Sequence, residues 1–314
     1  MQIPSLVILW VIGRRQFLTT SLPIILQTSP SDSHGQVLDE SSQKVRREIH
    51  SLVTQDPSLA GQFVRLAFHD ATTRDGALGG PNGSLQYELD RSENRGLAKP
   101  LMIVQKKAQN AHLSLADTIA LAGAQAIETV GGPSIPIRLG RTDAETADPE
   151  FLRRPLSAST PRSIVTKTLP SAGLDSDGLR LYFRNLQLSE PEWVALTGGS
   201  HGLGRHVSLL GMPKDCLKNL TRTCLEDAPI LLPFVTDSVY RFDNTYFQAL
   251  LQWNNNEIEM GKVAFIPTDV AMVVDQGLRI HVQRFANDVG FFRRTFARAY
   301  QKLVETKATS RNRY

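Results

Sequence analysis

Apolar residues that recur at helical spacing run through most of this chain and constrain its fold more than any other feature. In the stretch QVLDESSQKVRREIHSLV, Leu38, Val45, Ile49 and Val53 fall on one helical face. Similar patterns and start signals predict helices at 36–53, 58–73, 96–110, 114–128, 175–187, 189–199, 243–254, 276–286 and 289–304. Alternating strand patterns are sparse, so the sequence predicts a mainly α fold.

Two of these helices begin with a capping-box signature, in which a serine is followed three residues later by an acid. The pairs are Ser114 with Asp117 and Ser189 with Glu192. The glycine- and proline-rich passages GALGGPNGS, GGPSIPIRLGR and PEFLRRPLSASTPRS predict long ordered loops between helices.

The charge pattern gives no sign of a nucleic-acid partner. The 314 residues carry a net charge of +4, and the lysines and arginines are scattered except in the tail KATSRNRY. The two cysteines, Cys216 and Cys224, form no zinc-type CxxC pair and lie in one loop-like region. A disulfide and two reduced thiols both remain open.

Residues 1–35 are expected to lie outside the fold. They hold two apolar runs around Arg14 and Arg15, and each run is too short for a convincing membrane span. The segment resembles a twin-arginine export signal, which a receptor reads. The alternative is a frayed amphipathic extension in which the paired arginines are accidental. Membrane association is expected only if this segment stays uncleaved.

The stretch FVRLAFHDATT places a cation, a ring and an imidazole together. Its helix puts four side chains on one face: Arg65, Phe68, His69 and Thr72. An ordinary surface His–Asp pair is the alternative. The same helix also carries Val64, Leu66 and Ala67, however, so the charged face is expected to look into a cavity.

The stretch VALTGGSHGLGR allows two interpretations. Gly198, Ser200 and Gly202 have the spacing of a nucleophile elbow, which would make the protein a serine hydrolase using Ser200. That motif needs a strand before the serine, whereas these residues closely follow a helix start. The second interpretation is a helix that presents His201 to a large flat group, with its glycines allowing something bulky to approach the backbone.

Several stretches, taken in their order along the chain, resemble one family. They are RLAFHDATTRDGALGGPNGSLQYELDRSENRGL, SLADTIALAGAQAIETVGGPSIPIRLGRTDA, VALTGGSHGLGR, FDNTYFQALL, and FIPTDVAMVVD with the helix after it. Together they resemble the plant-type haem peroxidase superfamily, class I, in its ascorbate peroxidase and related branch. The resemblance spans residues 36–303 and implies two helical lobes with one haem b between them. The distal lobe would be about 36–150 and the proximal lobe about 151–304, within a domain of 36–314 that ends in a basic tail at 305–314.

The resemblance assigns seven residues to the two faces of the haem. On the distal side are Arg65, Phe68, His69, Asn94 and Glu88, and on the proximal side are His201 and Asp269. Arg65 and His69 would be the catalytic pair, and Asn94 would orient His69. The Glu88 carboxylate would steady the segment that carries Asn94. His201 would be the axial iron ligand and Asp269 its hydrogen-bond partner.

Elementary chemistry supports these roles. Peroxide must lose a proton from one oxygen and gain one on the other before its O–O bond breaks, and a neutral His69 can make that transfer. Arg65 stabilises the negative charge that develops on the leaving oxygen. Asp269 makes His201 more anionic, which lowers the reduction potential of the iron. Two donor molecules then return two electrons, one at a time.

Three departures from the family pattern shape the expectations. The segment after His201 lacks the expected arginine motif and tryptophan, with Phe234 or Val235 near the place of the tryptophan. The donor is therefore left open between ascorbate and a phenolic reductant. One extra residue precedes His201, for which a helix distortion such as a π-bulge is expected. Gly202 replaces a hydroxyl residue and leaves Asp243 alone, so an additional bound cation is not expected.

The sequence thus predicts a haem peroxidase that detoxifies hydrogen peroxide with a small reductant. It is expected in the chloroplast, and the thylakoid lumen is the compartment considered within it. A haem-free structural or binding protein of the lumen is the alternative from another class. The presence of Arg65, His69 and His201 favours the enzyme, because a pseudoenzyme would be expected to lose one of them. The oligomeric state is left open.

Overall fold

The computed structural model describes residues 30–72, 80–148, 174–207, 231–233, 240–253 and 265–305. It divides into two units, Met1–Val37 and Leu38–Tyr314. Of the first unit, only the opening turns of helix α1 (Pro30–Gln55) are described. Residues 30–35, expected outside the fold, are therefore helical, whereas residues 1–29 and the paired arginines lie outside the described part of the chain. The division into distal and proximal lobes stays a prediction.

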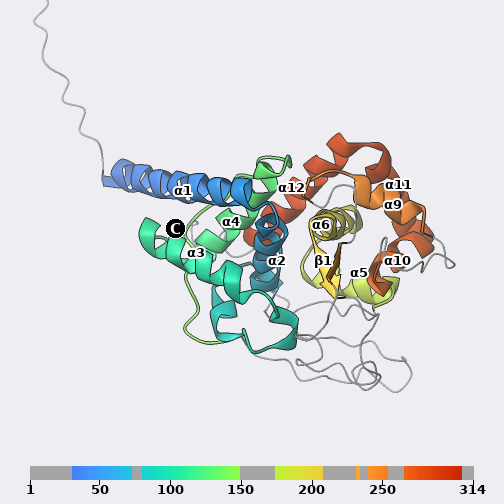
Figure 1. Cartoon of the computed structure of the whole chain (residues 1–314), viewed down its shortest axis with the longest axis horizontal. Helices are drawn as coiled ribbons and strands as arrows, with labels where there is room; N and C mark the ends of the chain where they lie inside the picture. The colour runs from blue at the N-terminus through green and yellow to red at the C-terminus, as the bar shows by residue number, and fades with distance from the viewer. Residues whose placement is uncertain are drawn as a thin grey trace, which may run out of the picture. The chain divides into compact units, whose positions relative to one another are not determined.

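The described chain is predominantly helical, which confirms the predicted fold class (Figure 1). After α1 come α2 (Leu59–Thr72), α3 (Ala98–Ala111), α4 (Leu115–Thr129), α5 (Ser176–Asn185), α6 (Glu190–Gly202), α9 (Thr245–Leu251), α10 (Pro267–Val274), α11 (Gln276–Asn287) and α12 (Val289–Glu305). Two short 3₁₀ helices, η1 (Ser84–Tyr87) and η2 (Ser92–Asn94), lie in the loop between α2 and α3.

Helix α10 and two short strands, like η1 and η2, lie outside the spans that periodicity predicts. Helix α10 has eight residues and is too short to show a repeating apolar pattern, although Pro267 marks its start. Strands β1 (Arg205–Val207) and β2 (Leu231–Pro233) pair antiparallel, with His206 opposite Leu232. Three-residue strands give no alternation to read, and their stability comes from the pairing.

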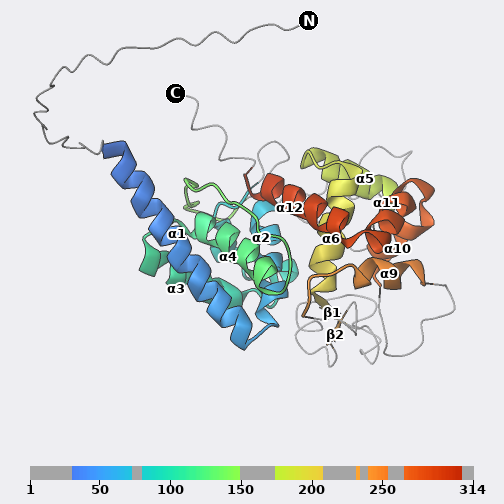
Figure 2. The ribbon, with the colours of Figure 1, turned by 90° about the horizontal axis from the view of Figure 1, so that it is seen from above.

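The helices of the second unit form two groups. Helix α2 packs against α4 and α3, while α6 packs against α12, α11 and α9. Helix α12 contacts both α6 and α2, and so it reaches from one group to the other (Figure 2). The core around α6 is rich in rings that contact one another edge to face or at a tilt: Phe242, Phe247, Phe285, Phe292 and Phe296. Such contacts fix the position of α6 in the core.

A close backbone approach joins α2 to the end of α6. A Cβ atom at Gly61 would lie only 2.2 Å from the carbonyl oxygen of Leu203, so glycine is required there. The contact ties the helix that carries His69 to the helix that carries His201.

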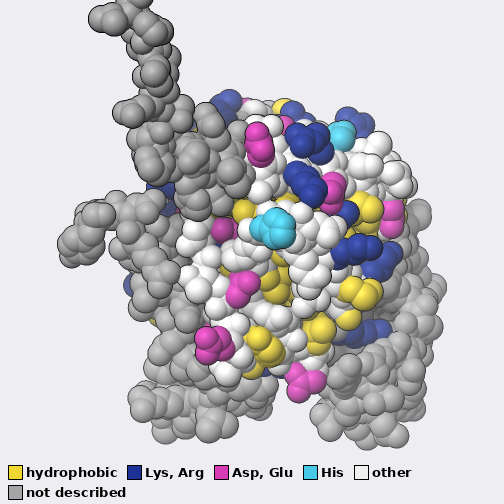
Figure 3. Space-filling view, turned by 90° about the vertical axis from the view of Figure 1, so that its left-hand side faces the viewer, with side chains coloured by type: hydrophobic (Ala, Val, Ile, Leu, Met, Phe, Trp, Pro, Cys, Tyr) yellow, Lys and Arg dark blue, Asp and Glu magenta, His cyan; other side chains and the backbone are white. Residues whose placement is uncertain are grey.

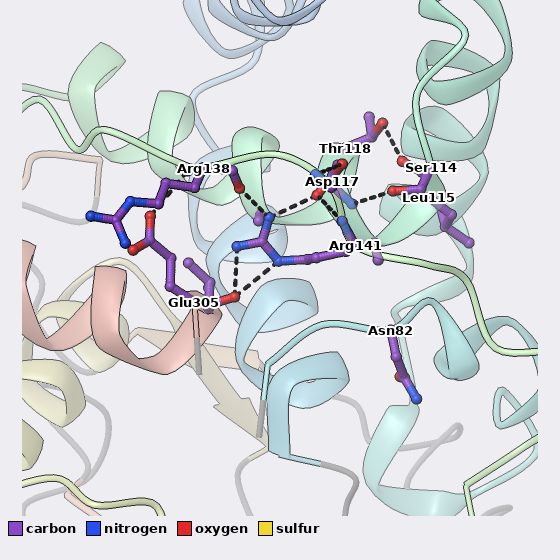
Figure 4. A network of polar contacts seen from close by, with 12 residues as sticks. Asn82, Ser114, Leu115, Asp117, Thr118, Arg138, Arg141 and Glu305 are labelled. Atoms are coloured by element: carbon purple, nitrogen blue, oxygen red, sulfur yellow. Dashed lines mark hydrogen bonds and ion pairs between the residues drawn. The ribbon is translucent and has the colours of Figure 1, made fainter. Parts of the chain in front are cut away.

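A buried arginine clamps the end of α12 to the first group of helices (Figure 4). Arg141 donates to Asp117 Oδ1 at 2.7 Å, and its Nε and Nη2 donate to the Val304 carbonyl at 2.9 and 2.7 Å. The Asp117 carboxylate is thereby used by Arg141 and by the backbone N–H of Gly140. The capping box predicted for Ser114 is therefore only half formed, since Ser114 Oγ accepts from Asp117 N.

At the predicted start of α6, the Glu192 carboxylate accepts from both the backbone N–H and the hydroxyl of Ser189. On the face drawn in Figure 3, basic side chains of the described residues lie among acidic ones. None of the described helices is both long and apolar enough to span a bilayer.

Candidate active site

Helix α2 and the turn η2 bring His69 and Asn94 together. His69 Nδ1 lies 2.8 Å from Asn94 Oδ1, and both residues are buried. The amide orientation is fixed because Asn94 Nδ2 donates to the backbone carbonyl of Glu88 at 2.9 Å. An amide oxygen can only accept, so Nδ1 of His69 carries the proton and Nε2 is left as the basic nitrogen.

Glu88 steadies this segment by a different route from the one predicted. Its backbone carbonyl, not its carboxylate, holds Asn94. The carboxylate instead accepts from Arg91 Nη1 at 2.6 Å and from the backbone N–H of Asp148 at 2.9 Å. Burial raises the pKa of Glu88, although these bonds act to lower it. The difference arises because the turn after η1 directs the Glu88 carbonyl toward Asn94, whereas the Glu88 side chain binds Arg91 and the backbone of Asp148.

Arg65 lies against the same segment. Its Nη1 donates to the Arg95 carbonyl at 2.7 Å and its Nη2 to the Glu93 carbonyl at 2.6 Å. No ion pair between Arg65 and a carboxylate occurs within the described residues. Burial, and then the charge of Arg95, lower the pKa of Arg65 to about 10, so the guanidinium remains charged near neutral pH.

His69 is kept neutral by its surroundings. Burial, followed by the positive charge of Arg65, lowers its pKa to about 3, although the bond to Asn94 opposes this. A neutral imidazole is the form that can accept a proton. Phe68 is half-buried and meets the His69 ring nearly edge to face, with centroids 6.4 Å apart.

Asp70 has a structural role that was not predicted from the sequence. This buried carboxylate accepts backbone N–H bonds from Asn82, Gly83 and Leu85 and so anchors the loop to the end of α2. Burial raises the pKa of Asp70, while these bonds lower it. An acid directly after a histidine in the last turn of a helix, followed by a glycine-rich loop, was the available signal.

On the second site, α6 and α10 bring His201 and Asp269 together. His201 Nδ1 lies 2.7 Å from Asp269 Oδ1. Asp269 is completely buried, and its Oδ2 accepts from the backbone N–H of Ile266 at 3.0 Å. Asp269 therefore caps the start of α10 and holds His201 at the same time. The His201 side chain is 26% exposed, so the imidazole lies at the edge of the core.

Tyr246 is a further residue of this site that sequence reasoning missed. Its hydroxyl donates to Asp269 Oδ1 at 2.5 Å, and its ring meets the His201 ring edge to face at 6.1 Å. Burial, and then the charge of Asp269, raise the pKa of Tyr246. Its motif, FDNTYFQALL, gave no sign that the hydroxyl points to the carboxylate. The positions considered for a proximal tryptophan, Phe234 and Val235, lie outside the described residues, as do Cys216 and Cys224.

Bulky groups do approach the backbone at two of the glycines before His201, as the sequence predicts. A Cβ at Gly198 would lie 2.2 Å from Phe247, and one at Gly199 would lie 2.3 Å from Phe296. The bulky groups that approach this part of α6 are therefore core phenylalanines. Because neither glycine has a side chain, the backbone of α6 can pack directly against these rings.

The structure also overturns the nucleophile elbow and the expected π-bulge. Ser200 lies within α6, which is α-helical from Glu190 to Gly202 without a π turn. No strand precedes the serine in that span, so the serine hydrolase interpretation is wrong. The extra residue is accommodated by a regular helix that places His201 in its last turn, where the chain leaves the helix at Leu203.

The residues of the two sites fit a haem. Nδ1 of His201 is engaged by Asp269, which makes Nε2 the ring nitrogen for an iron. No group of three or more metal-ligating side chains meets within the described residues, and one histidine suits an iron whose other ligands come from a porphyrin. Near Arg65, Nη1 of Arg95 is buried without a hydrogen-bond partner. Two close guanidiniums suit the anionic carboxylates that a haem carries.

This helical fold, with one histidine held by an amide and another held by a carboxylate, is that of a haem-dependent peroxidase. The comparisons with known proteins agree. The family model described as Peroxidase matches residues 45–288. "Putative L-ascorbate peroxidase 6" of Arabidopsis thaliana is 33% identical over 276 residues, covering 84% of this chain and 68% of that protein.

Two further relatives extend the similarity. "L-ascorbate peroxidase 5, peroxisomal" of Arabidopsis thaliana is 32% identical and covers 84% of this chain and 81% of its own length. "Putative heme-binding peroxidase" of Cryptococcus neoformans var. neoformans is 30% identical, with 84% and 76% covered. Other relatives carry "chloroplastic" in their names. The chain belongs to the peroxidase family.

Proposed function

We propose that this chain reduces hydrogen peroxide at one haem b, with electrons from a small reductant, and so removes a reactive oxygen species. One observation carries the proposal: both histidines are fixed through Nδ1, His69 by Asn94 and His201 by Asp269, so that each presents Nε2. A base and an iron ligand with fixed tautomers are the two groups that this reaction requires.

A bound haem would supply the redox centre that gives two electrons to peroxide. Nε2 of His69 takes the proton from the near oxygen of the peroxide and delivers it to the far oxygen. Asn94 holds the ring in the tautomer that makes this possible. Arg65, charged and half-buried beside the same loop, stabilises the negative charge on the departing oxygen.

We propose an ascorbate-type or phenolic reductant. The relatives named as ascorbate peroxidases support the first class, and the positive pair Arg65 and Arg95 would attract an anionic donor. Steady-state rates with ascorbate and with a neutral phenol, measured at two ionic strengths, separate the classes. A rate that falls with added salt only for ascorbate identifies an anionic donor.

The test of the peroxidase proposal is the absorption spectrum of the full chain mixed with haem, before and after peroxide. The wild-type protein should show a Soret band that shifts with peroxide, and His201→Ala should lose haem binding. His69→Ala should keep haem but react with peroxide about 10²- to 10⁴-fold more slowly, because a general base is gone. His50→Ala is the matched control, since His50 is exposed on α1.

The haem-free structural or binding protein is the competing outcome of that experiment. A wild-type chain without a Soret band, or a band that disappears only when a histidine other than His201 is replaced, would contradict the peroxidase proposal. The retained geometry of His69 with Asn94 favours the enzyme, because a binding protein has no use for a fixed base.

For the compartment, we propose the chloroplast and, within it, the thylakoid lumen, with residues 1–35 as the targeting segment. The relatives named chloroplastic support the first step, although others are named peroxisomal. Arg14 and Arg15 support the second step, because a paired-arginine signal is read at a membrane. Replacing both arginines by lysine in a fluorescent fusion tests it, and unchanged import into the lumen would contradict the role of the pair.

A further inference from the structure

Two donors share one oxygen of the buried carboxylate beside His201. Tyr246 OH lies 2.5 Å and His201 Nδ1 lies 2.7 Å from the same atom, Asp269 Oδ1. The other oxygen, Oδ2, accepts the backbone N–H of Ile266. Asp269 is 0% and Tyr246 1% exposed, so water does not replace either donor. The charge of Asp269 is therefore divided among three fixed partners.

The tyrosine is held rigidly in this position. Its ring meets Phe247, Phe265 and the His201 ring in edge-to-face contacts, at centroid distances of 5.2, 5.7 and 6.1 Å. It lies one residue after the N-terminus of α9, which packs against α6 and α10. The hydroxyl is thus directed at the carboxylate by the packing of three helices.

A carboxylate oxygen that accepts two hydrogen bonds holds each donor less strongly than it would hold one alone. Each bond withdraws charge from the oxygen, and low surrounding polarity makes that competition stronger. The Tyr246 hydroxyl therefore weakens the pull of Asp269 on the Nδ1 proton of His201. It limits how anionic the imidazole becomes.

We propose that Tyr246 is a positioning residue that competes with His201 for Asp269 Oδ1 and, by weakening that hydrogen bond, limits the electron donation from His201 to the haem iron. The inference rests on the proposed function for its consequence at the iron. Its first step, competition for Asp269 Oδ1, concerns the chain alone.

Tyr246→Phe in the haem-loaded full chain tests the consequence, since it removes the hydroxyl and keeps the ring. Asp269 should then bind the His201 N–H more strongly. The ferric form should be favoured by up to about tenfold, a fall in midpoint potential of up to about 59 mV for a one-electron couple. The iron–histidine stretching band should move to higher frequency. Asp269→Asn should move both readouts in the opposite direction.

Tyr300→Phe is the matched control. Tyr300 is also buried, and its hydroxyl donates to the Ala120 carbonyl at 3.1 Å in the contact between α12 and α4. Its loss removes a buried hydrogen bond without touching Asp269. The midpoint potential and the iron–histidine band should stay at their wild-type values in this variant.

A second readout needs no haem. In the full chain labelled with ¹⁵N-histidine, the His201 Nδ1 proton should resonate further downfield in Tyr246→Phe than in wild type, because its hydrogen bond is stronger. An unmoved or upfield resonance overturns the proposal. So does a midpoint potential in Tyr246→Phe that equals the Tyr300→Phe control or shifts like Asp269→Asn. If wild type binds no haem, the proposed function fails, and the proton resonance still decides the role of Tyr246.

Discussion

At the scale of single residues, the two sites follow one rule. Each histidine is held at Nδ1 by an oxygen, from Asn94 in one site and from Asp269 in the other. The neutral amide of Asn94 leaves His69 a base, whereas the carboxylate of Asp269 makes His201 a stronger electron donor. The identity of the acceptor therefore decides what each imidazole can do.

The pKa of His69, lowered to about 3, predicts the pH dependence of the reaction with peroxide. The base stays neutral from pH 7 down to about pH 4, so its protonation should not slow the reaction in that range. Asn94→Asp places a negative charge beside Nδ1, raises the pKa of His69 and should move the acid limb to higher pH. Stopped-flow rates with peroxide check both expectations, and a wild-type midpoint near the ordinary histidine value of about 6.5 would contradict them.

At the scale of elements, the position of α6 is set by the aromatic rings that its glycines allow to approach. The rings of Phe247 and Phe296 occupy the space where side chains at Gly198 and Gly199 would lie. The helix thereby sits close enough to α9 and α12 for His201, in its last turn, to meet Asp269 on α10. The placement of His201, the proposed iron ligand, therefore depends on the absence of side chains at Gly198 and Gly199.

Gly198→Ala should destabilise the protein, although alanine is the better helix former. The added Cβ would lie 2.2 Å from the Phe247 ring, and overpacking of a filled core costs about 1–3 kcal/mol. In Gly202→Ala the new atom would lie 3.5 Å from Tyr246 Cβ, an ordinary contact, so this control should be neutral or slightly stabilised. Denaturant unfolding compares the two, and equal midpoints would show that the ring moves aside.

At the scale of the whole molecule, the two groups of helices are joined by α12 and its clamp. Arg141 and Asp117 are nearly fully buried, and Arg141 also holds the last carbonyls of α12 through Val304. Arg141→Ala leaves the Asp117 charge buried without its partner, which costs about 3–5 kcal/mol. Thermal unfolding measures the loss. Arg180→Ala is a half-exposed comparison and should cost much less; a similar loss in both would contradict the importance of burial.

The division at residue 37 predicts where the chain can be shortened. Among residues 40–55 of α1, whose burial is described, the buried side chains are Val45, Ile49 and Val53, each at most 1% exposed. Removing residues 1–29 should leave the melting temperature unchanged. Removing residues 1–54 should cost several kcal/mol, because burying each such side chain contributes about 1.5–3 kcal/mol. A large loss on removal of residues 1–29 would contradict the predicted boundary.

How much of the structure could be predicted depends on how far along the chain each sequence signal extends. Apolar periodicity is local, and it placed the long helices correctly, whereas the eight residues of α10 were too few to show it. The face shared by Arg65 and His69 is likewise a local consequence of helical spacing. Contacts between distant segments could be predicted only where the family resemblance implied them. For Glu88 the resemblance pointed to the carboxylate, whereas the backbone carbonyl of this residue holds Asn94.

The sequence by itself determined a mainly helical chain and the order of its motifs, and it predicted His69 and His201 as the histidines of the two sites. Only the tertiary structure decided what surrounds them: that core rings fill the space beside Gly198, that a regular helix carries the extra residue, and that Tyr246 shares Asp269 with His201. The physical reason is distance along the chain. Helical spacing acts over a few residues, whereas the acceptor of a buried hydroxyl is set by how separate helices pack.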